Sequence, residues 1–484
     1  MNNKMILTFI VPPCFDHKQP AERTAGCTRV VYLAPNIYEL TVAATLAKNA
    51  CNEVRYHDFV YNKTSEVEFD SFLKSDDSDV YLIWTVNLSI NTDLYAISVI
   101  RRHHPNVKVV LLGPGPTHFI KKCLVDENTF IVRGEPEETA DELVKAFHAN
   151  SPINSIKGLS WITADGRVVN NPSRPLIKNL DNIPFAARQL LGNAVYHNPK
   201  LKLSPYTTMI TSRNCPFHCL YCVPSSLSFA REIENRRETG KKPVIGFRTV
   251  ENVEQEVAML AAQGYKAIGF MDDNFIWNEE RTAKLCAIMK KYGMKWGCEA
   301  RVDAITEPIA KMLGESNCGY IDLGVESFND DILAYIKKGI KVSDIYRAIE
   351  LLKKYGVPVK LNILIGSSPL ETRETVRHTL REAKRLDVDQ VMFNIVSPFP
   401  GTEYYKLCKE NGWLATEDYI PTDVQRESIL NLPNLTSKEM ERLLFKNNLS
   451  YFVSLGFIIK QLSRFKSLSE LRAAFKALKI KLFG

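Results

Sequence analysis

The sequence predicts an α/β protein with two regions in which strands and helices alternate, followed by a small helical region. Two observations predict this fold class. Apolar runs of strand length alternate with helical patterns in residues 1–150 and again in residues 206–415. The stretch between them contains Pro172, Pro175 and Pro184, which interrupt regular structure. Strands that alternate with helices through short connections are typical of parallel sheets.

The length of 484 residues predicts several domains, which we place at 1–150, 151–205, 206–415 and 416–484. A hydrophobic content of 45% with 24% charged residues is enough for sizeable cores. No apolar run is long enough to span a membrane, and eleven cysteines without paired spacing fit a reducing cytoplasm. Most of the net charge of +7 comes from residues 455–484, so we expect no nucleic-acid partner.

Residues 1–150 predict a doubly wound parallel sheet, whose ligands lie beyond the carboxyl ends of the strands. The expected strands are Met5–Val11, Glu53–Phe59, Asp79–Val86, Lys108–Gly113 and Phe130–Arg133. The expected helices are Tyr38–Asn49, Asp93–His103 and Glu137–Ala149. Residues 151–205 are expected to be a linker with one hairpin, which turns at Asp165-Gly166.

Two loops of this first region stand out. Gly113 and Gly115 let the backbone approach a bulky group, and Thr117 offers a hydroxyl beside them, although most glycine-rich strand ends are turns. The segment Arg133–Glu138 precedes a helix, where its acidic residues also fit a first turn favoured by the helix dipole.

Residues 206–415 predict a partial (β/α)6 barrel, whose chemistry lies at the carboxyl ends of the strands. The expected strands are Tyr206–Arg213, Ala267–Asp273, Lys295–Arg301, Tyr320–Glu326, Val359–Gly366 and Gln390–Pro398. Polar residues or glycine stand at or just after the ends of four of them: Asp272, Arg301, Glu326, Ser327 and Gly366. These residues fit either a polar site at one mouth or ion pairs within the core.

Three cysteines, Cys215, Cys219 and Cys222, follow the first barrel strand with CxxxCxxC spacing. Cysteine thiolates are the usual ligands of iron–sulfur clusters, and three thiolates leave one iron of a four-iron cluster open. The alternatives are inert core cysteines or zinc. Structural zinc requires four closed ligands, and no second cysteine pair follows, although His218 offers a nitrogen.

With Tyr221 before the last cysteine, this motif resembles the signature of the radical S-adenosylmethionine (SAM) superfamily. The resemblance implies a [4Fe–4S] cluster that binds SAM at its open iron. It also implies that Asp272 lies near the SAM amino group and that Gly366 lies near the adenine. The carboxylate and ribose would then be contacted by Arg301, Glu326 and Ser327.

The order of elements in residues 78–143 is similar to the cobalamin-binding domain that precedes many radical SAM barrels. The resemblance implies cobalamin contacts at the strand ends, from Thr85, Asn87, Gly113, Gly115, Thr117, Gly134, Glu135 and Glu138. One departure concerns the Asp-x-His-x-x-Gly loop that supplies a lower cobalt ligand. The nearest candidate, His57-Asp58, lacks this spacing, so we expect either no lower histidine or a domain without cofactor.

The family resemblance implies a cytoplasmic enzyme that generates a 5′-deoxyadenosyl radical and methylates an unactivated carbon of a small molecule or lipid. Its electron donor would be a flavodoxin or ferredoxin. Relatives of this layout also form or contract rings, including the anaerobic cyclase of chlorophyll synthesis and hopanoid-modifying enzymes. A corrinoid or cluster carrier without catalysis is the non-enzymatic alternative.

The transfer RNA methylthiotransferases share the barrel and bind a second cluster through three cysteines. Cys14 and Cys51 have suitable spacing for two of them, but no cysteine stands near Trp84. The basic RNA-binding β-domain that ends those enzymes is also missing, which disfavours this class.

At the C-terminus, Thr436 and Glu439 form a capping box that predicts a helix over 437–453. Residues 455–484 contain seven basic residues and one acidic residue among apolar residues at helical spacing. This pattern fits a helix that packs on the barrel with a solvated basic face. It also fits peripheral contact with anionic lipid.

Overall fold

The computed structural model describes residues 4–15, 19–30, 32–416 and 423–454, and the expected features of residues 455–484 lie outside these ranges. The chain divides into two compact units. The first unit comprises residues 1–216, 223–275 and 287–298, and the second comprises residues 217–222, 276–286 and 299–484. Among the described residues, no helix combines the length and the apolar composition that crossing a membrane requires.

The first unit contains a seven-stranded sheet in the order β2-β1-β3-β4-β5-β6-β7. Its strands are β1 (Met5–Val11), β2 (Asn52–Asp58), β3 (Val80–Trp84), β4 (Lys108–Leu112), β5 (Thr129–Val132), β6 (Leu159–Ile162) and β7 (Val168–Asn170). The first five are parallel, whereas β6 pairs antiparallel with β5. The hairpin expected in the linker therefore extends this sheet, because the edge of β5 offers free backbone partners.

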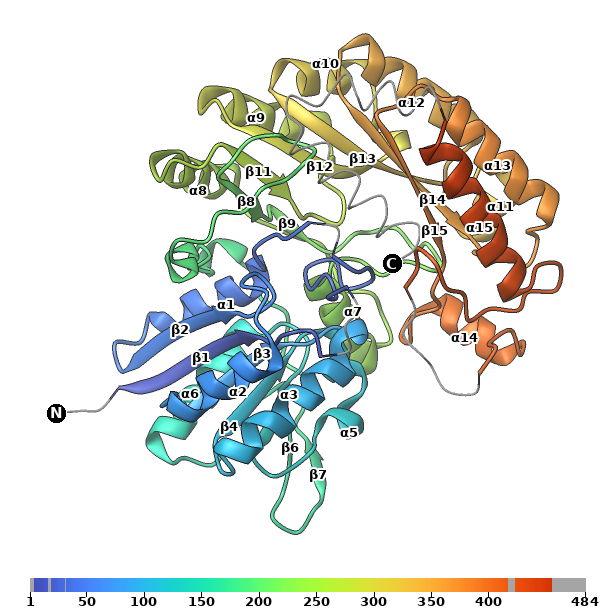
Figure 1. Ribbon diagram of the computed structural model, residues 1–484. Coiled ribbons are helices and arrows are strands. Elements are labelled where there is room, and N and C mark those ends of the chain that lie inside the picture. The colour runs from blue at the N-terminus through green and yellow to red at the C-terminus, as the bar shows by residue number, and fades with distance from the viewer. Residues whose placement is uncertain (1–3, 16–18, 31, 417–422, 455–484) are drawn as a thin grey trace. The chain divides into compact units, whose positions relative to one another are not determined.

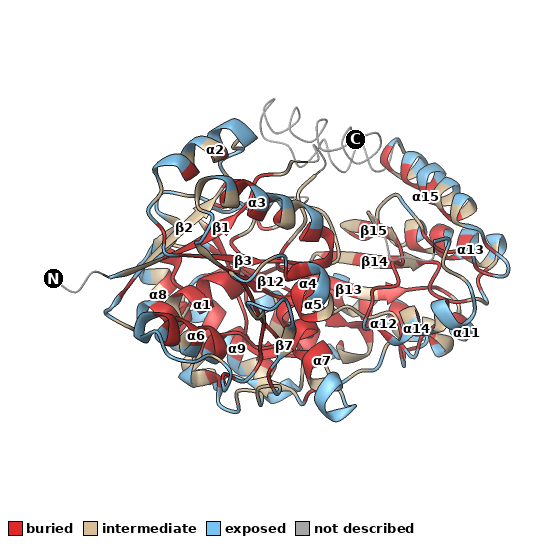
Figure 2. Cartoon of the chain, turned by 90° about the horizontal axis from the view of Figure 1, so that it is seen from below, coloured by how far each residue is buried: buried red, intermediate tan, exposed pale blue. Residues whose placement is uncertain are grey.

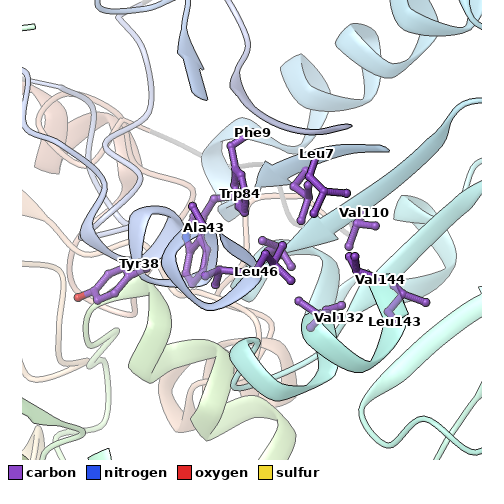
Figure 3. Close-up of a cluster of buried hydrophobic side chains, with 14 of the residues drawn as sticks. Leu7, Phe9, Tyr38, Ala43, Leu46, Trp84, Val110, Val132, Leu143 and Val144 are labelled. Atoms are coloured by element: carbon purple, nitrogen blue, oxygen red, sulfur yellow. The ribbon is translucent and has the colours of Figure 1, made fainter. Parts of the chain in front are cut away.

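Helices cover both faces of this sheet (Figure 1). They are α1 (Ile37–Ala47), α2 (Glu66–Ser75), α3 (Ile90–His103), α4 (Pro114–His118), α5 (Ile120–Cys123) and α6 (Glu137–Ala149). Alternate strand residues face opposite sides. Leu82 and Trp84 of β3 pack with α1 and α6, whereas Tyr81 and Ile83 pack with α2 and α3. The first of these two cores is drawn in Figure 3, and together they confirm the doubly wound α/β class.

Six parallel strands form the second sheet, in the order β15-β14-β13-β12-β11-β8. They are β8 (Tyr206–Met209), β11 (Ala267–Phe270), β12 (Lys295–Arg301), β13 (Cys318–Glu326), β14 (Val359–Ile365) and β15 (Gln390–Ile395). The short strands β9 (Ser212–Arg213) and β10 (Gly246–Phe247) pair separately. Sheet residues are mostly buried (Figure 2). Six strands joined by helices confirm the partial barrel.

The helices of this part are α7 (Ser226–Thr239), α8 (Val250–Ala262), α9 (Glu279–Lys291), α10 (Glu307–Glu315), α11 (Asp330–Tyr335), α12 (Val342–Lys354), α13 (Arg373–Arg385), α14 (Glu403–Glu410) and α15 (Ser437–Phe452). Thr436 closes the predicted capping box with Glu439 at the start of α15. Helix α7 was not predicted, because it contains many charged residues and lacks a simple apolar stripe. Its first nine residues are nonetheless buried.

A buried ion-pair network joins the end of β5 to β9 and α7 within the first unit. Arg213 donates to Glu135 and Glu137, and Arg231 lies 3.1 Å from Glu135. All four side chains are at most 4% exposed. Burial favours the neutral acid, but Arg231 and Arg213 hold the pKa of Glu135 below its ordinary value. The network therefore remains charged near neutral pH.

Replacing Arg213 should test how much the fold depends on this network. Arg213→Met leaves two buried carboxylates short of a partner, so we expect a loss of about 3–5 kcal/mol in the free energy of unfolding. The matched control is Arg236→Met, because Arg236 is 41% exposed and forms an i,i+4 pair with Glu232 that should contribute under about 1 kcal/mol. Urea denaturation measures both. Equal small losses would show that the network is not structurally important.

Candidate functional site

The segment before the first cysteine is held by α7. Asn214 has a left-handed backbone (φ +70°) and is fully buried. Its N–H donates to Ser228 Oγ at 3.0 Å, its side-chain amide donates to the Ser228 carbonyl at 3.2 Å, and Arg231 donates to its Oδ1. The backbone that leads into Cys215 is therefore fixed by side chains of a helix that lies after the motif in the sequence.

The three cysteines of the motif are half-buried, and all eleven cysteines of the chain are described and lack disulfide bonds. Cys215 belongs to the first unit, and Cys219 and Cys222 belong to the second. The Cys222 N–H donates to the Cys219 carbonyl at 3.2 Å. Among the described residues, no three His, Cys, Asp or Glu side chains are placed to hold one metal ion. In a four-iron cluster, by contrast, each thiolate binds a different iron.

In the second unit, the segment Phe217–Cys222 is anchored by backbone and aromatic contacts. Leu220 N–H donates to the Ile336 carbonyl, and Tyr404 N–H donates to the Leu220 carbonyl, both at 3.0 Å. The guanidinium of Arg301 lies 3.6 Å from the centre of the Phe217 ring, which is a cation–π contact. The strand end at Arg301 thus lies against the segment that carries the last two cysteines.

Arg301 and Glu326 share one neighbour, Lys338, which sequence reasoning missed. Arg301 donates to the Lys338 carbonyl at 2.7 Å and pairs with Asp303 at 2.9 Å. The Lys338 ammonium lies 2.8 Å from Glu326 and 3.4 Å from the Tyr221 hydroxyl. Lys338 follows α11 in the segment IKKGIK, whose lysines look alike in sequence. Only the tertiary structure identifies the one that is buried.

The electrostatics of this group follow from burial and charge. Burial works against the charged ammonium, but Glu326 and Cys219 together raise the pKa of Lys338 above its ordinary value. Burial, followed by Glu326 and the two nearby cysteines, raises the pKa of Tyr221 well above the usual range. Lys338 is therefore a cation and Tyr221 a neutral phenol at physiological pH.

The backbone at Glu326 is unusual. Its φ of +67° is rare for a residue other than glycine, and the pairing of β13 with β14 shifts register between Gly324 and Glu326. A Cβ on Gly324 would lie 2.6 Å from the Lys338 ammonium and 2.9 Å from Glu326 Oε1, so a side chain at that position would have to displace the ends of these two side chains. Strained residues of this kind gather at functional sites, where surrounding contacts maintain them.

The remaining barrel residues of the prediction have partners within the protein. Asp272 accepts from the Thr211 N–H and hydroxyl and from the Ser212 hydroxyl, at 2.5–3.1 Å. Ser327 Oγ lies 3.2 Å from the hydroxyl of Thr379. Gly366 (φ +81°) donates to Glu371 at 2.8 Å. Their roles in binding SAM stay predictions, and these contacts show how the protein itself orients them.

The loops after β3 and β4 differ in how far their residues are engaged by the protein itself. A Cβ on Gly113, whose φ is +95°, would lie 2.8 Å from the Thr85 carbonyl, and a Cβ on Gly115 would lie 3.1 Å from it, so the packing of the protein itself favours glycine at both positions. The expected loop begins helix α4 instead, and Thr117 Oγ1 donates to the Gly113 carbonyl. By contrast, Thr85 Oγ1 and both polar atoms of the Asn87 amide are buried and have no hydrogen-bond partner within residues 4–15, 19–30, 32–416 and 423–454.

Most of the predicted residues in the acidic loop after β5 contact other residues of the protein. The Gly134 N–H donates to Thr117 Oγ1 at 3.2 Å, and a Cβ on Gly134 would meet Glu234 of α7. Glu135 belongs to the buried network described above. Glu138 is exposed and pairs with Arg174 at 3.3 Å. Whether these three residues also contact a cofactor stays a prediction.

The glycine at the end of β14 allows a test of the packing there. Gly366→Ala combines left-handed strain with a Cβ 2.6 Å from Met440 Sδ, whereas Gly264→Ala at φ +85° has open space around its Cβ. We expect Gly264→Ala to cost about 1 kcal/mol and Gly366→Ala to cost about 1–3 kcal/mol more. Thermal denaturation of both variants measures the difference. Equal costs would mean that Met440 gives way freely.

Comparison with known proteins identifies the family. Residues 209–383 match the radical SAM superfamily. An uncharacterized methyltransferase of Pyrococcus horikoshii is 31% identical over 420 residues, which cover 85% of this chain and 86% of that protein. The anaerobic magnesium-protoporphyrin IX monomethyl ester cyclase of Rubrivivax gelatinosus is 23% identical, with coverage of 77% and 66%.

One solved structure shows how far the fold is shared. It is that of the radical S-adenosylmethionine methyltransferase TsrM from Kitasatospora setae, with cobalamin and a [4Fe–4S] cluster bound. The TM-score is 0.63 at 17% sequence identity, and the match covers 84% of this chain and 75% of that one. At this identity the likeness concerns the fold. With the motif and the Pyrococcus relative, the comparisons establish that this chain belongs to the radical SAM superfamily.

Proposed function

We propose that this chain is a cobalamin-dependent radical SAM enzyme that methylates an unactivated carbon of a small molecule or lipid. The observation that carries the proposal is the CxxxCxxC motif after β9 in a chain that matches a methyltransferase-named relative over 85% of its length. When bound, the reduced cluster and SAM supply a radical, and cobalamin supplies a methyl group. The likeness to the cyclase supports ring formation as the second candidate.

The donor set fits a cluster. Cys215, Cys219 and Cys222 are half-buried thiols without disulfide bonds, on a segment fixed on one side by Asn214 and on the other by Leu220. Three thiolates match the ligand number of a four-iron cluster with one open iron. In this proposal Arg301, Glu326 and Lys338 orient the segment and supply charge, while Tyr221 stays neutral and hydrogen-bonded.

The fit for cobalamin rests on Thr85 and Asn87. Their buried polar atoms have no partner in the described part of the chain, and a buried polar group without a hydrogen bond is costly. The amide side chains of a corrin offer both donors and acceptors. Thr85 follows the carboxyl end of β3, where ligands of doubly wound sheets bind. We therefore propose these two residues as cofactor contacts and assign Gly113 and Gly115 to packing.

Three further parts of the proposal rest on sequence and family. The functional division would be a cofactor region at 1–150, a connecting segment at 151–205 and a catalytic barrel at 206–415. An external reductant, such as a flavodoxin or ferredoxin, would deliver electrons. Contact of residues 455–484 with anionic lipid is proposed from their basic, apolar composition.

The cluster assignment is tested by iron content and SAM cleavage together. Anaerobic reconstitution should give about four irons per chain, and strong reduction with SAM should release 5′-deoxyadenosine. Replacing Cys215, Cys219 and Cys222 by Ala should abolish both, because the cluster loses every thiolate. The measurements are iron analysis and chromatography of the nucleoside.

The matched control replaces Cys14, Cys27 and Cys51 by Ala, which should leave iron and cleavage unchanged. If the control variant loses half of the iron, these three cysteines hold a second cluster, and the result would support the methylthiotransferase class. If the wild-type protein holds iron but never releases 5′-deoxyadenosine, it is a carrier.

The cobalamin assignment is tested by Asn87→Leu. Because no described residue bonds the buried amide, this change should leave the unfolding free energy of the cofactor-free chain unchanged or higher. It should nonetheless weaken corrinoid retention by about tenfold, since one hydrogen-bonding group is lost. Thermal denaturation and equilibrium dialysis with hydroxocobalamin measure the two effects.

The control for this test is Asn171→Leu. Asn171 is equally buried but donates to two carbonyls at 2.7 and 3.0 Å, so its loss should cost about 1–3 kcal/mol without affecting cobalamin. Unchanged corrinoid retention in Asn87→Leu, or no retention by the wild-type protein, would remove this residue or the cofactor from the proposal.

A further inference from the structure

A groove of about 770 Å³ lies on the second unit between α13 and α15. Helix α13 contributes Arg377, Arg381 and Lys384 to its lining, and α15 contributes Lys446, Asn447 and Ser450. Glu374 is the acidic residue among the lining groups. Four cations therefore surround a concave surface that belongs to neither the cysteine segment nor the strand ends.

These cations differ from the other basic residues nearby. Arg373 pairs with Glu439 and Arg385 pairs with Glu382, so their charges are balanced within the protein. Arg377, Arg381 and Lys446 are exposed and form no ion pair within the part of the chain that the structure describes. Their positive charge is available to an external anion.

The side chain of Asn447 is an independent sign of a ligand. Asn447 is 5% exposed and lines the groove, and neither its amide nitrogen nor its amide oxygen has a hydrogen-bond partner among the residues that the structure describes. A buried amide without partners is unfavourable unless a ligand completes it. Because an amide both donates and accepts, it suits an oxygen-rich headgroup with hydroxyl groups.

An apolar stripe runs beside the rim of the groove. Phe445 and Leu449 of α15, and Val453 directly after it, are 45%, 37% and 52% exposed. Their spacing of four places them on one helical face. Lys446 lines the groove three residues before Leu449, so the stripe and the cations are neighbours. Exposed residues are common on α13 and α15 (Figure 2). Apolar residues flanked by cations are typical of helices that lie in a membrane interface.

We propose that this face of α13 and α15 docks on an anionic membrane. The groove would receive the phosphate headgroup of a phospholipid, with Asn447 bonding its polar oxygens, while the stripe enters the acyl boundary. The charge argues against the chain's own C-terminal segment as the occupant, because residues 455–484 are also strongly basic. This inference does not depend on the proposed catalytic function.

The test measures binding of the reconstituted full-length chain to vesicles by co-sedimentation. The vesicles are phosphatidylcholine alone or mixed with phosphatidylglycerol. A cation near an anionic surface strengthens binding by roughly fivefold. Arg377→Gln/Arg381→Gln/Lys446→Gln should therefore weaken binding to the mixed vesicles by about a hundredfold. Phe445→Ser/Leu449→Ser should also weaken it, which separates insertion from purely ionic contact.

Two matched triple variants serve as controls, each with the same loss of charge. Lys121→Gln/Lys122→Gln/Lys290→Gln changes basic residues of other helices and should bind vesicles as the wild-type protein does. Lys476→Gln/Lys479→Gln/Lys481→Gln changes the C-terminal segment. When the groove substitutions are added to this variant, its binding to the mixed vesicles should weaken as it does in the wild-type protein.

Three outcomes would overturn the proposal. Loss of binding only in the C-terminal variant would make that segment the membrane contact. Equal loss in the first control would show that net charge alone matters. Inorganic phosphate that binds in a groove-dependent way, without any vesicle binding, would show that the ligand is a free phosphate.

Discussion

The buried pairing of Arg213 with Glu135 and Glu137 is the constraint on which the first unit depends. It joins the loop after β5, at the carboxyl edge of the first sheet, to the strand that precedes Cys215. Charges in the interior are favourable only when each is fully compensated, so these positions cannot drift independently. Asn214 adds to the effect, because α7 fixes its backbone in a left-handed conformation. The first sheet and the start of the cysteine motif therefore form one cooperative structure.

The second unit also contains buried charges that are compensated by neighbouring groups, but it uses a different set of residues. Lys338 is buried between Glu326 and the segment Phe217–Cys222, and Arg301 binds its carbonyl while stacking on Phe217. Glu326, which pairs with Lys338, has a positive φ, and a Cβ on the nearby Gly324 would lie 2.6 Å from the Lys338 ammonium. Charge, strain and glycine placement thus act together at the strand ends, where barrels of this kind carry their chemistry.

Several residues expected to touch a cofactor also have contacts that stabilise the protein itself. Asp272 accepts four hydrogen bonds from the end of the first barrel strand, and Gly113 packs against the Thr85 carbonyl. Within the described residues, Thr85 and Asn87 near the first sheet and Asn447 on α15 are among the residues with buried polar side-chain atoms that have no hydrogen-bond partner. Unpaired buried polar groups and glycine-rich loops are different signals, because a buried polar atom needs a partner whereas glycine is required wherever two backbones approach closely.

The sequence by itself determined the fold class, the parallel strands, the cysteine motif and the family, because these depend on local periodicity and on spacing along the chain. It placed β1 and β12 with their observed bounds, and it found the cap of α15. Only the tertiary structure decided that the hairpin β6–β7 extends the first sheet and that Lys338 is the lysine paired with Glu326. It also decided that α7 has a buried face. These features arise from contacts between residues far apart in sequence, where a charged side chain can be buried because a distant partner compensates it.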